Sequence, residues 1–207
     1  MQHRIAIPSR YRLDAQDSEL YYIADWLPIN EANSAFQSLR EEITWEQGEV
    51  FIFGKHHLTP RLQSWHGEPD AVYAYSNKML LPKPWTPSLL NLKRKLEDLG
   101  IFTNSVLANL YRDGNDKMGW HRDNEKELGP QPVIASLSFG GQRDFVLRHR
   151  LTKQRICIPL ENGSLFVMAG QTQHFWEHCL PRRARCHHER INLTYRTIIM
   201  GNPEEFV

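Results

Sequence analysis

The sequence has few cysteines and no long apolar run, and both absences limit what the protein can be. Its 207 residues include only Cys157, Cys179 and Cys186, too few for the disulfide network that stabilises small secreted proteins. No apolar stretch approaches the ~20 residues of a membrane-spanning helix. The segment Met1 to Leu13 also lacks the apolar core of a signal peptide. We therefore expect a protein of a reducing compartment that is neither secreted nor bound to a membrane.

The start of the chain leaves one targeting alternative open. It is free of acidic residues up to Leu13 and carries Arg4, Arg10 and Arg12, a composition also found in transit peptides. Without such a peptide, we expect a cytoplasmic protein in a bacterium and a nuclear one in a eukaryote.

The chain has no excess of charge of either sign. Lysine and arginine number 25 against 24 acidic residues, which gives a net charge of +1, so a nucleic-acid partner would have to meet a local basic patch. We find no internal repeat, no low-complexity segment and no boundary between two independent domains. The length fits one domain, 1–207, and we expect a monomer.

The first hundred residues predict a helical and loop-rich cover. Residues 1–25 look irregular. Apolar residues at helical spacing after Asn30 predict a helix over 31–43, and a leucine stripe capped by Ser88 and ended by Gly100 predicts a second. Between the helices we expect short strands at 50–53 and 71–75, with a Pro-, Gly- and His-rich loop from Gly54 to Asp70.

From residue 101 the pattern changes to short strands separated by turns. Asp113-Gly114, Gly140-Gly141 and Asn162-Gly163 are strong turn signals. The expected strands are 106–111, 133–139, 143–149, 155–160, 164–169 and 191–200. Many short strands in succession indicate a sandwich, barrel or jelly roll over 101–207, and hence an α+β protein.

The last strand carries the most informative pattern. Side chains alternate between the two faces of a strand. In Arg190-Ile-Asn-Leu-Thr-Tyr-Arg196, one face is therefore wholly polar with an arginine at each end, and the other is wholly apolar. Two arginines so placed indicate an anionic ligand held at both ends.

His121 and Asp123 form a candidate metal site. On extended backbone both point the same way, and a second histidine would complete the two-histidine, one-carboxylate triad of non-haem Fe(II) oxygenases. By chemistry alone that histidine is open among His174, His178, His187 and His188. A zinc site from Cys179, Cys186 and His187 is a weaker alternative, because no fourth ligand stands at suitable spacing.

A 2-oxo acid is the expected cosubstrate of such a site, because it chelates the metal and supplies two electrons. 2-Oxoglutarate carries two carboxylates, which suits Arg190 and Arg196. Asn109 and Tyr111 are also two residues apart, so an amide and a phenol would face the same cavity.

These motifs, taken in order, resemble the AlkB family of Fe(II)- and 2-oxoglutarate-dependent dioxygenases, and most closely its branch that repairs alkylated DNA. The resemblance runs from Phe51 to Ile199 and is strongest in four segments, Asn109–Gly114, Trp120–Glu125, Ile134–Gly140 and Arg190–Arg196. It implies a double-stranded β-helix, or jelly roll, with N-terminal helices and a nucleotide-recognition lid at about 50–80.

The resemblance also implies which residues bind iron and the cosubstrate. His178 stands in the aromatic-x-His context of the family's distal ligand, twelve positions before Arg190, so the expected ligands are His121, Asp123 and His178. The implied 2-oxoglutarate pocket comprises Asn109, Tyr111, Arg190, Asn192, Thr194 and Arg196. Within it, we expect Arg196 at the distal carboxylate and Arg190 at the metal end.

For the substrate, the resemblance implies a base flipped out of the nucleic acid into a pocket. The candidate contacts are Tyr73 and Tyr75 for stacking, Glu125 for the exocyclic group, Phe53 for the gap left by the base, and Arg61. Arg182, Arg183 and Arg185 are candidates for phosphate contacts. A short hairpin at Arg148–Lys153 stands where some relatives have a longer one, so the resemblance leaves open both contacts to an opposite strand and any preference for double-stranded DNA.

The implied activity is oxidative demethylation of 1-methyladenine and 3-methylcytosine in DNA, with Fe(II), 2-oxoglutarate and O₂. Two alternatives remain at this point. The first is the same chemistry on methylated RNA, a protein or a small molecule. The second is a non-catalytic jelly-roll module that binds another anion, against which the intact His-x-Asp motif argues.

Overall fold

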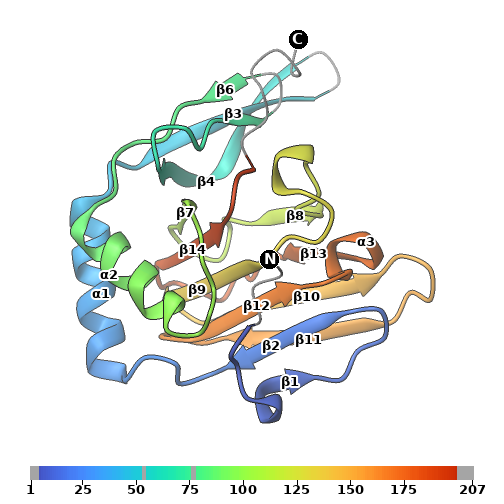
Figure 1. Cartoon of the computed structure of the whole chain (residues 1–207). Coiled ribbons are helices and arrows are strands. Elements are labelled where there is room, and N and C mark those ends of the chain that lie inside the picture. The colour runs from blue at the N-terminus through green and yellow to red at the C-terminus, as the bar shows by residue number, and fades with distance from the viewer. Residues whose placement is uncertain (1–4, 53–54, 76–77, 200–207) are drawn as a thin grey trace.

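The computed structural model describes residues 5–52, 55–75 and 78–199, and side chains throughout these ranges except at 50–52, 55–56, 73–75 and 78–80. It consists of two facing antiparallel sheets with helices along one side (Figure 1). The larger sheet has the order β1-β2-β12-β9-β14-β7-β4-β3, and the smaller one β11-β10-β13-β8. Two such sheets form the jelly-roll core that the sequence predicts, so the structure confirms the predicted fold class.

The strands of the larger sheet come from both halves of the chain. They are β1 (Arg12–Leu13), β2 (Glu19–Ile23), β3 (Glu46–Ile52), β4 (Lys55–Gly67), β7 (Ser105–Tyr111), β9 (Ile134–Gly140), β12 (Leu165–Ala169) and β14 (Arg190–Arg196). The smaller sheet contains β8 (Met118–His121), β10 (Arg143–His149), β11 (Arg155–Leu160) and β13 (Trp176–Leu180). A separate hairpin joins β5 (Tyr73–Tyr75) to β6 (Lys78–Leu80).

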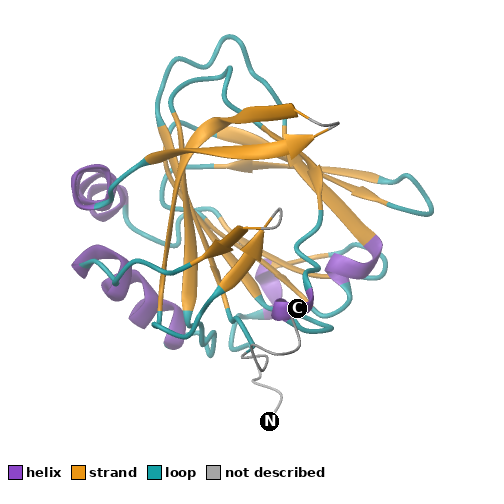
Figure 2. Cartoon of the chain, turned by 90° about the horizontal axis from the view of Figure 1, so that it is seen from above, coloured by secondary structure: helices purple, strands orange, loops and turns teal. Residues whose placement is uncertain are grey.

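Two helices cover the outer face of the larger sheet (Figure 2). Helix α1 (Ile29–Glu42) buries Leu39, and α2 (Pro87–Glu97) buries three leucines, all in one cluster with the apolar face of β14. The Ser88 hydroxyl donates to Glu42 Oε1 at 2.7 Å, which ties the two helices together. In the part of the chain that the structure describes, no helix is long and apolar enough to cross a membrane.

The space between the two sheets is divided into an apolar part and a polar part. Leu20, Phe166, Leu147 and Trp176 belong to an apolar cluster that draws on both sheets. The polar face of β14 lies at the other part of this space, where a cavity remains. The sheets are therefore held together at one end and left open for a ligand at the other.

Several predicted elements are confirmed with small shifts. Helix α1 begins after Pro28 rather than Asn30, and α2 begins at Pro87, where the Thr86 hydroxyl rather than Ser88 caps it. Strand β14 ends at Arg196 instead of residue 200. Further elements were not predicted, among them β6, β8, β13 and the short helix α3 (Thr172–Phe175).

Two predictions for the first half of the chain are wrong. The stretch 54–70, predicted as a loop, contains the thirteen-residue strand β4, which pairs with β3 and β7. Residues 1–25, predicted as irregular, contain β1 and β2 of the larger sheet. The buried side chains of β4 include Thr59, Arg61 and Ser64, so this strand lacks the apolar alternation by which strands are identified.

Tyr195 gives a test of the contact between β14 and the helices. Its fully buried hydroxyl donates to the Leu89 carbonyl at 2.8 Å. Tyr195→Phe should therefore lower the free energy of unfolding by about 1 kcal/mol, measured by urea denaturation. The control Tyr11→Phe removes a hydroxyl that accepts an exposed hydrogen bond from Arg10 at 3.3 Å, and should change stability by less than about 0.5 kcal/mol. Equal effects of the two variants would contradict the role given to this hydrogen bond.

Candidate active site

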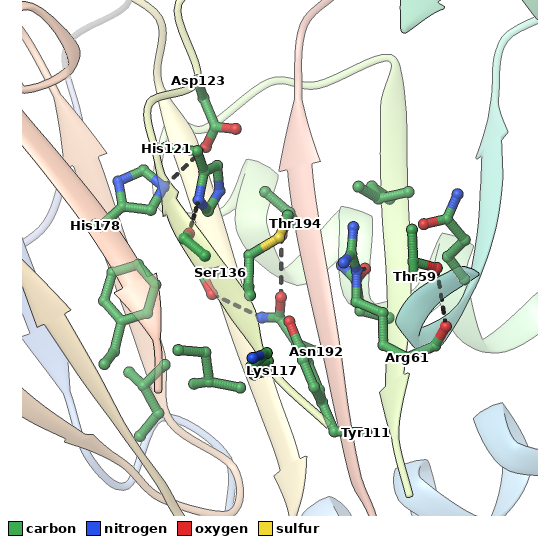
Figure 3. Close-up of a pocket in the computed structure, with 18 of the residues that line it drawn as sticks. Thr59, Arg61, Tyr111, Lys117, His121, Asp123, Ser136, His178, Asn192 and Thr194 are labelled. Carbon is green, nitrogen blue, oxygen red and sulfur yellow. Dashed lines mark hydrogen bonds and ion pairs between the residues drawn. The ribbon is translucent and has the colours of Figure 1, made fainter. Parts of the chain in front are cut away.

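A cavity of about 460 Å³ opens between the two sheets, next to the polar face of β14. Its lining includes every predicted metal and 2-oxoglutarate residue, together with Glu125 and Arg61. Figure 3 shows the labelled side chains converging on this space from β4, β7, β8, β9, β13 and β14 and from the loops on either side of β8. Residues far apart in the sequence are thus brought to one site.

His121, Asp123 and His178 form a compact cluster at one end of the cavity. Their ligand atoms all lie within 4.8 Å of one another, and the ring centroids of the histidines are 4.3 Å apart. Strand pairing explains this proximity, because His178 of β13 lies directly opposite His121 of β8. Asp123 follows in the next loop, with its Oδ2 atom 3.7 Å from His178 Nε2 (Figure 3).

The protonation of this cluster suits a cation. Burial, and then the neighbouring His121, lower the pKa of His178 to about 3, so the imidazole is neutral at physiological pH. Burial alone would raise the pKa of Asp123, but the positive charge of Arg196, followed by smaller contributions of the two neighbouring histidines, outweighs burial and holds the pKa below its usual value. The cluster therefore offers a carboxylate and a neutral imidazole inside the protein.

The hydrogen bond of His121 leaves one of its ring nitrogens available as a metal ligand. His121 Nδ1 lies 2.8 Å from the Gly119 carbonyl, a contact that places the proton on Nδ1 and leaves the Nε2 lone pair free. Two imidazole nitrogens and one carboxylate oxygen on one side of a site are the donor set of non-haem Fe(II), with positions left for other ligands. The residues present therefore fit an Fe(II) ion.

The polar face of β14 continues from this cluster along the cavity, as predicted. Arg190, Asn192, Thr194 and Arg196 line the cavity, whereas Ile191, Leu193 and Tyr195 are fully buried on the helix side. On the adjacent β7, Tyr111 pairs with Arg190 and Asn109 with Asn192, so the two strands form one wall. The structure thus brings these six residues together around one cavity.

Hydrogen bonds fix the polar side chains of this wall. The Asn192 amide donates to the Ser136 hydroxyl at 2.8 Å, and the Thr194 hydroxyl donates to Asn192 Oδ1 at 3.1 Å (Figure 3). Arg190 donates to the Ser138 hydroxyl at 2.9 Å, and its guanidinium lies 5.3 Å from the centre of the Tyr111 ring. Hydrogen bonds between residues of the protein thus hold these side chains in place.

The two arginines take the opposite ends from those predicted. Arg196 Nη1 lies 3.5 Å from Asp123 Oδ1, so Arg196 is at the metal end of the cavity and Arg190 is at the far end, beside Tyr111. The predicted order of the two arginines is therefore wrong. The residue pattern defines a face but does not say which end of a strand approaches a loop from another sheet.

Arg190 is a buried cation with no acidic partner in the described part of the chain. Its pKa is lowered to about 10, mainly by burial, and the guanidinium remains charged at neutral pH. Its Nε atom has no hydrogen-bond partner among the described residues. Because an uncompensated buried charge is costly, the far end of the cavity is suited to an anionic group.

The structure describes the side chains of only some of the residues predicted to contact a substrate. Arg61 is buried in the cavity wall and donates through Nε to Asn109 Oδ1 at 2.8 Å, and Glu125 lies in the lining. Tyr73 and Tyr75 belong to β5, whose side chains are not among those described, and Phe53 lies outside the described residues. The role of the predicted lid at 50–80 stays a prediction.

The other histidines and the cysteines are not part of the cluster. His174 is exposed on α3 and packs against Phe175. Among the described residues, His121, Asp123 and His178 are the one group of three or more potential ligands close enough to hold a metal, so the zinc alternative gains no support. Arg182 and Arg183 pair with Asn115 and Asp144 on the surface.

Sequence reasoning missed several residues of the site. Ser136 and Ser138 of β9 hold Asn192 and Arg190, and their spacing of two within an apolar strand was a usable signal for a shared face. Gln63 and Lys117 also line the cavity. Gln63 lay in the wrongly predicted loop, and Lys117 lies between elements and carried no pattern.

Comparison with known proteins places this site in a family. The model of the 2OG-Fe(II) oxygenase superfamily matches residues 19–196. The chain is 41% identical over 181 residues to "DNA oxidative demethylase ALKBH2" of Mus musculus, covering 82% of this chain and 76% of that protein. Its identity to the protein of the same name from Homo sapiens is 40% over 182 residues, with coverages of 82% and 70%.

A second group of relatives supports the same family, and a solved structure supports the same fold. "Alpha-ketoglutarate-dependent dioxygenase alkB homolog 3" of Bos taurus is 39% identical over 184 residues, which cover 84% of this chain and 64% of that protein. The solved structure of OsALKBH1 superimposes with a TM-score of 0.59 over 89% of this chain and 99% of its own, at 12% identity, which bears on the fold alone. The chain therefore belongs to the AlkB family of the 2OG-Fe(II) oxygenase superfamily, and it is an Fe(II)- and 2-oxoglutarate-dependent dioxygenase.

Proposed function

We propose that this dioxygenase repairs DNA by oxidative demethylation of N-alkylated bases, with 1-methyladenine and 3-methylcytosine as substrates. The observation that carries the proposal is the single cavity that joins the His121, Asp123 and His178 cluster to a strand with a buried arginine at each end. The similarity to proteins named DNA oxidative demethylase supports DNA as the substrate. We further propose that the protein acts as a monomer.

We assign the iron to His121, Asp123 and His178. Bound iron supplies the activation of O₂ that couples decarboxylation of 2-oxoglutarate, to succinate and CO₂, with hydroxylation of the N-methyl group. One oxygen atom enters succinate and the other the methyl group, and the hydroxymethyl product then releases formaldehyde and the restored base. The protein contributes ligands of fixed protonation, since His178 is neutral and Asp123 ionised at physiological pH.

We assign the cosubstrate to the wall formed by β7 and β14, with residues Asn109, Tyr111, Arg190, Asn192, Thr194 and Arg196. Arg190, which lacks an acidic partner in the described chain, would bind the distal carboxylate together with the Tyr111 phenol. Arg196 lies beside Asp123 and would bind or orient the end that chelates the metal. The separation of the two guanidiniums along the strand thus selects a dicarboxylate.

The proposed lesions fit the charge of the cavity near the metal. Asp123 and Glu125 both line this region. The bases 1-methyladenine and 3-methylcytosine carry a positive charge, which a nearby carboxylate stabilises. We propose that Glu125 reads the exocyclic group of the base and that Tyr73 and Tyr75 stack on it. We further propose that Phe53 fills the gap that the flipped base leaves, and that Arg61 contacts the substrate from the cavity wall.

A formaldehyde-release panel tests the activity. Protein supplied with Fe(II), ascorbate and 2-oxoglutarate should release formaldehyde from oligonucleotides containing 1-methyladenine or 3-methylcytosine, compared as single-stranded DNA, duplex DNA and RNA. Asp123→Ala should reduce release to background, because the only carboxylate of the described metal cluster is lost. Release from RNA alone would refute the DNA assignment, and full turnover by Asp123→Ala would refute the ligand set.

Arg190→Lys tests the cosubstrate assignment. Lysine keeps the charge but cannot bind a carboxylate through two parallel N–H groups. We expect the KM for 2-oxoglutarate to rise by ~10–100-fold, the equivalent of one lost charged hydrogen bond, with little change in Fe(II) affinity. Arg40→Lys is the control, since Arg40 forms an exposed ion pair with Glu189 on the helix side. An unchanged KM in Arg190→Lys would show that the distal carboxylate binds elsewhere.

A further inference from the structure

The position of Asp123 is not fixed by strand pairing. Strand β8 ends at His121, which lies opposite His178 in the last residue pair of that ladder. Asp123 is two residues further on, in the loop that precedes a short turn of 3₁₀ helix at Lys126–Leu128. Its carboxylate nevertheless has to stay within reach of both histidines, so other contacts must hold this loop.

A side chain from another segment replaces the missing pairing. The backbone N–H of Asp123 donates to the side-chain oxygen Oε1 of Gln173 at 3.0 Å, and both residues are buried. The neighbouring Arg122 reaches the same residue, with its Nη1 atom 3.5 Å from the Gln173 carbonyl. The loop that carries Asp123 is therefore attached to Gln173 at two points.

Gln173 is itself held in one orientation. Its amide nitrogen donates to the Met168 sulfur at 3.3 Å, which directs Oε1 towards Asp123. The preceding Thr172 accepts a hydrogen bond from the Glu19 N–H at 3.0 Å and donates to the Ala169 carbonyl at 2.6 Å. These contacts fix α3 against β2 and β12 of the larger sheet, so Gln173 is a rigid acceptor.

The same segment also carries the second histidine of the cluster. Helix α3 (Thr172–Phe175) passes directly into β13, where His178 follows Gln173 by five residues. We propose that Gln173 is a positioning residue that sets the Asp123 carboxylate relative to His178. This proposal rests on the metal role of Asp123 and His178 proposed above. Segment 172–178 would then supply one ligand and place another.

Loss of the Gln173 oxygen should act on metal binding more than on the fold. Asp123 Oδ1 is also 3.5 Å from Arg196, which pulls the carboxylate along the cavity. Without the bond to its N–H, the Asp123 loop would shift under this attraction, and the ligand atoms would separate. Outer partners of metal ligands typically change metal affinity by ~10–100-fold when they are replaced, and we expect a loss in that range.

Two substitutions at Gln173 separate the hydrogen bond from the packing. Gln173→Met keeps the length and volume of the side chain but has no oxygen to accept from the Asp123 N–H. Gln173→Glu keeps an oxygen at the same reach and should recover most of the wild-type affinity. The matched control is Gln171→Met, because Gln171 is exposed and lies two residues before Gln173, next to segment 172–178.

The test is Co(II) binding to the full chain without 2-oxoglutarate, followed by the visible absorption of the bound ion. Gln173→Met should bind Co(II) ~10–100-fold more weakly than wild type and with an altered spectrum, whereas Gln171→Met should match wild type. Circular dichroism of the metal-free proteins checks that they are folded. If Gln173→Met does not fold, Gln173→Asn, whose amide is one methylene shorter, takes its place with the same expectation.

The outcomes distinguish this proposal from the function on which it rests. Wild-type affinity and spectrum in Gln173→Met, with binding lost in Asp123→Ala, would overturn the positioning role alone. The same role would be overturned if Gln173→Glu bound Co(II) no better than Gln173→Met. Wild-type binding by Asp123→Ala would instead overturn the proposed ligand set.

Discussion

The structure depends on one constraint, which is that the two faces of β14 must meet different environments. Ile191, Leu193 and Tyr195 are fully buried against the helices, while Arg190 and Arg196 face the cavity. A slip of one residue in the pairing with β7 and β9 would exchange these faces. Both guanidiniums would then enter the apolar cluster, at a cost of several kcal/mol each. The register of the central sheet and the geometry of the site are therefore fixed together.

In the smaller sheet, too, the packing of one strand face fixes part of the site, and this sheet lines the cavity from the side opposite β14. Trp176 and His178 lie two residues apart on β13 and share its inner face. Trp176 is fully buried in the apolar cluster between the sheets, and its indole N–H donates to the Gln16 carbonyl at 2.9 Å. The face that anchors the sandwich thus also presents His178 to the cavity. The inner face of β13 therefore contributes both to the stability of the core and to the placement of a metal ligand.

The sequence predicted those parts of the site that follow from alternation within a single strand. Arg190, Asn192, Thr194 and Arg196 were placed on one face, as were Asn109 and Tyr111, and the structure agrees. The choice of His178 among four histidines came from a family resemblance and not from spacing alone. The order of the two arginines was wrong, because it depends on the loop after β8, which approaches β14 from the other sheet.

Two of the elements that the sequence failed to predict, β4 and β8, share a physical cause. Strand β4 has Arg61 and Thr59 on a face that meets the cavity, and β8 leaves two of its four residues exposed. Strand β4 buries Trp65, but polar residues separate its apolar side chains, and β8 has no buried apolar residue. Neither strand therefore shows the period of two by which a strand is identified. A strand that lines a polar cavity has polar side chains on its inward face, because these side chains contact a ligand. Its sequence therefore resembles that of a loop. In such a protein, a missing apolar alternation between well-predicted strands is itself a sign of the binding site.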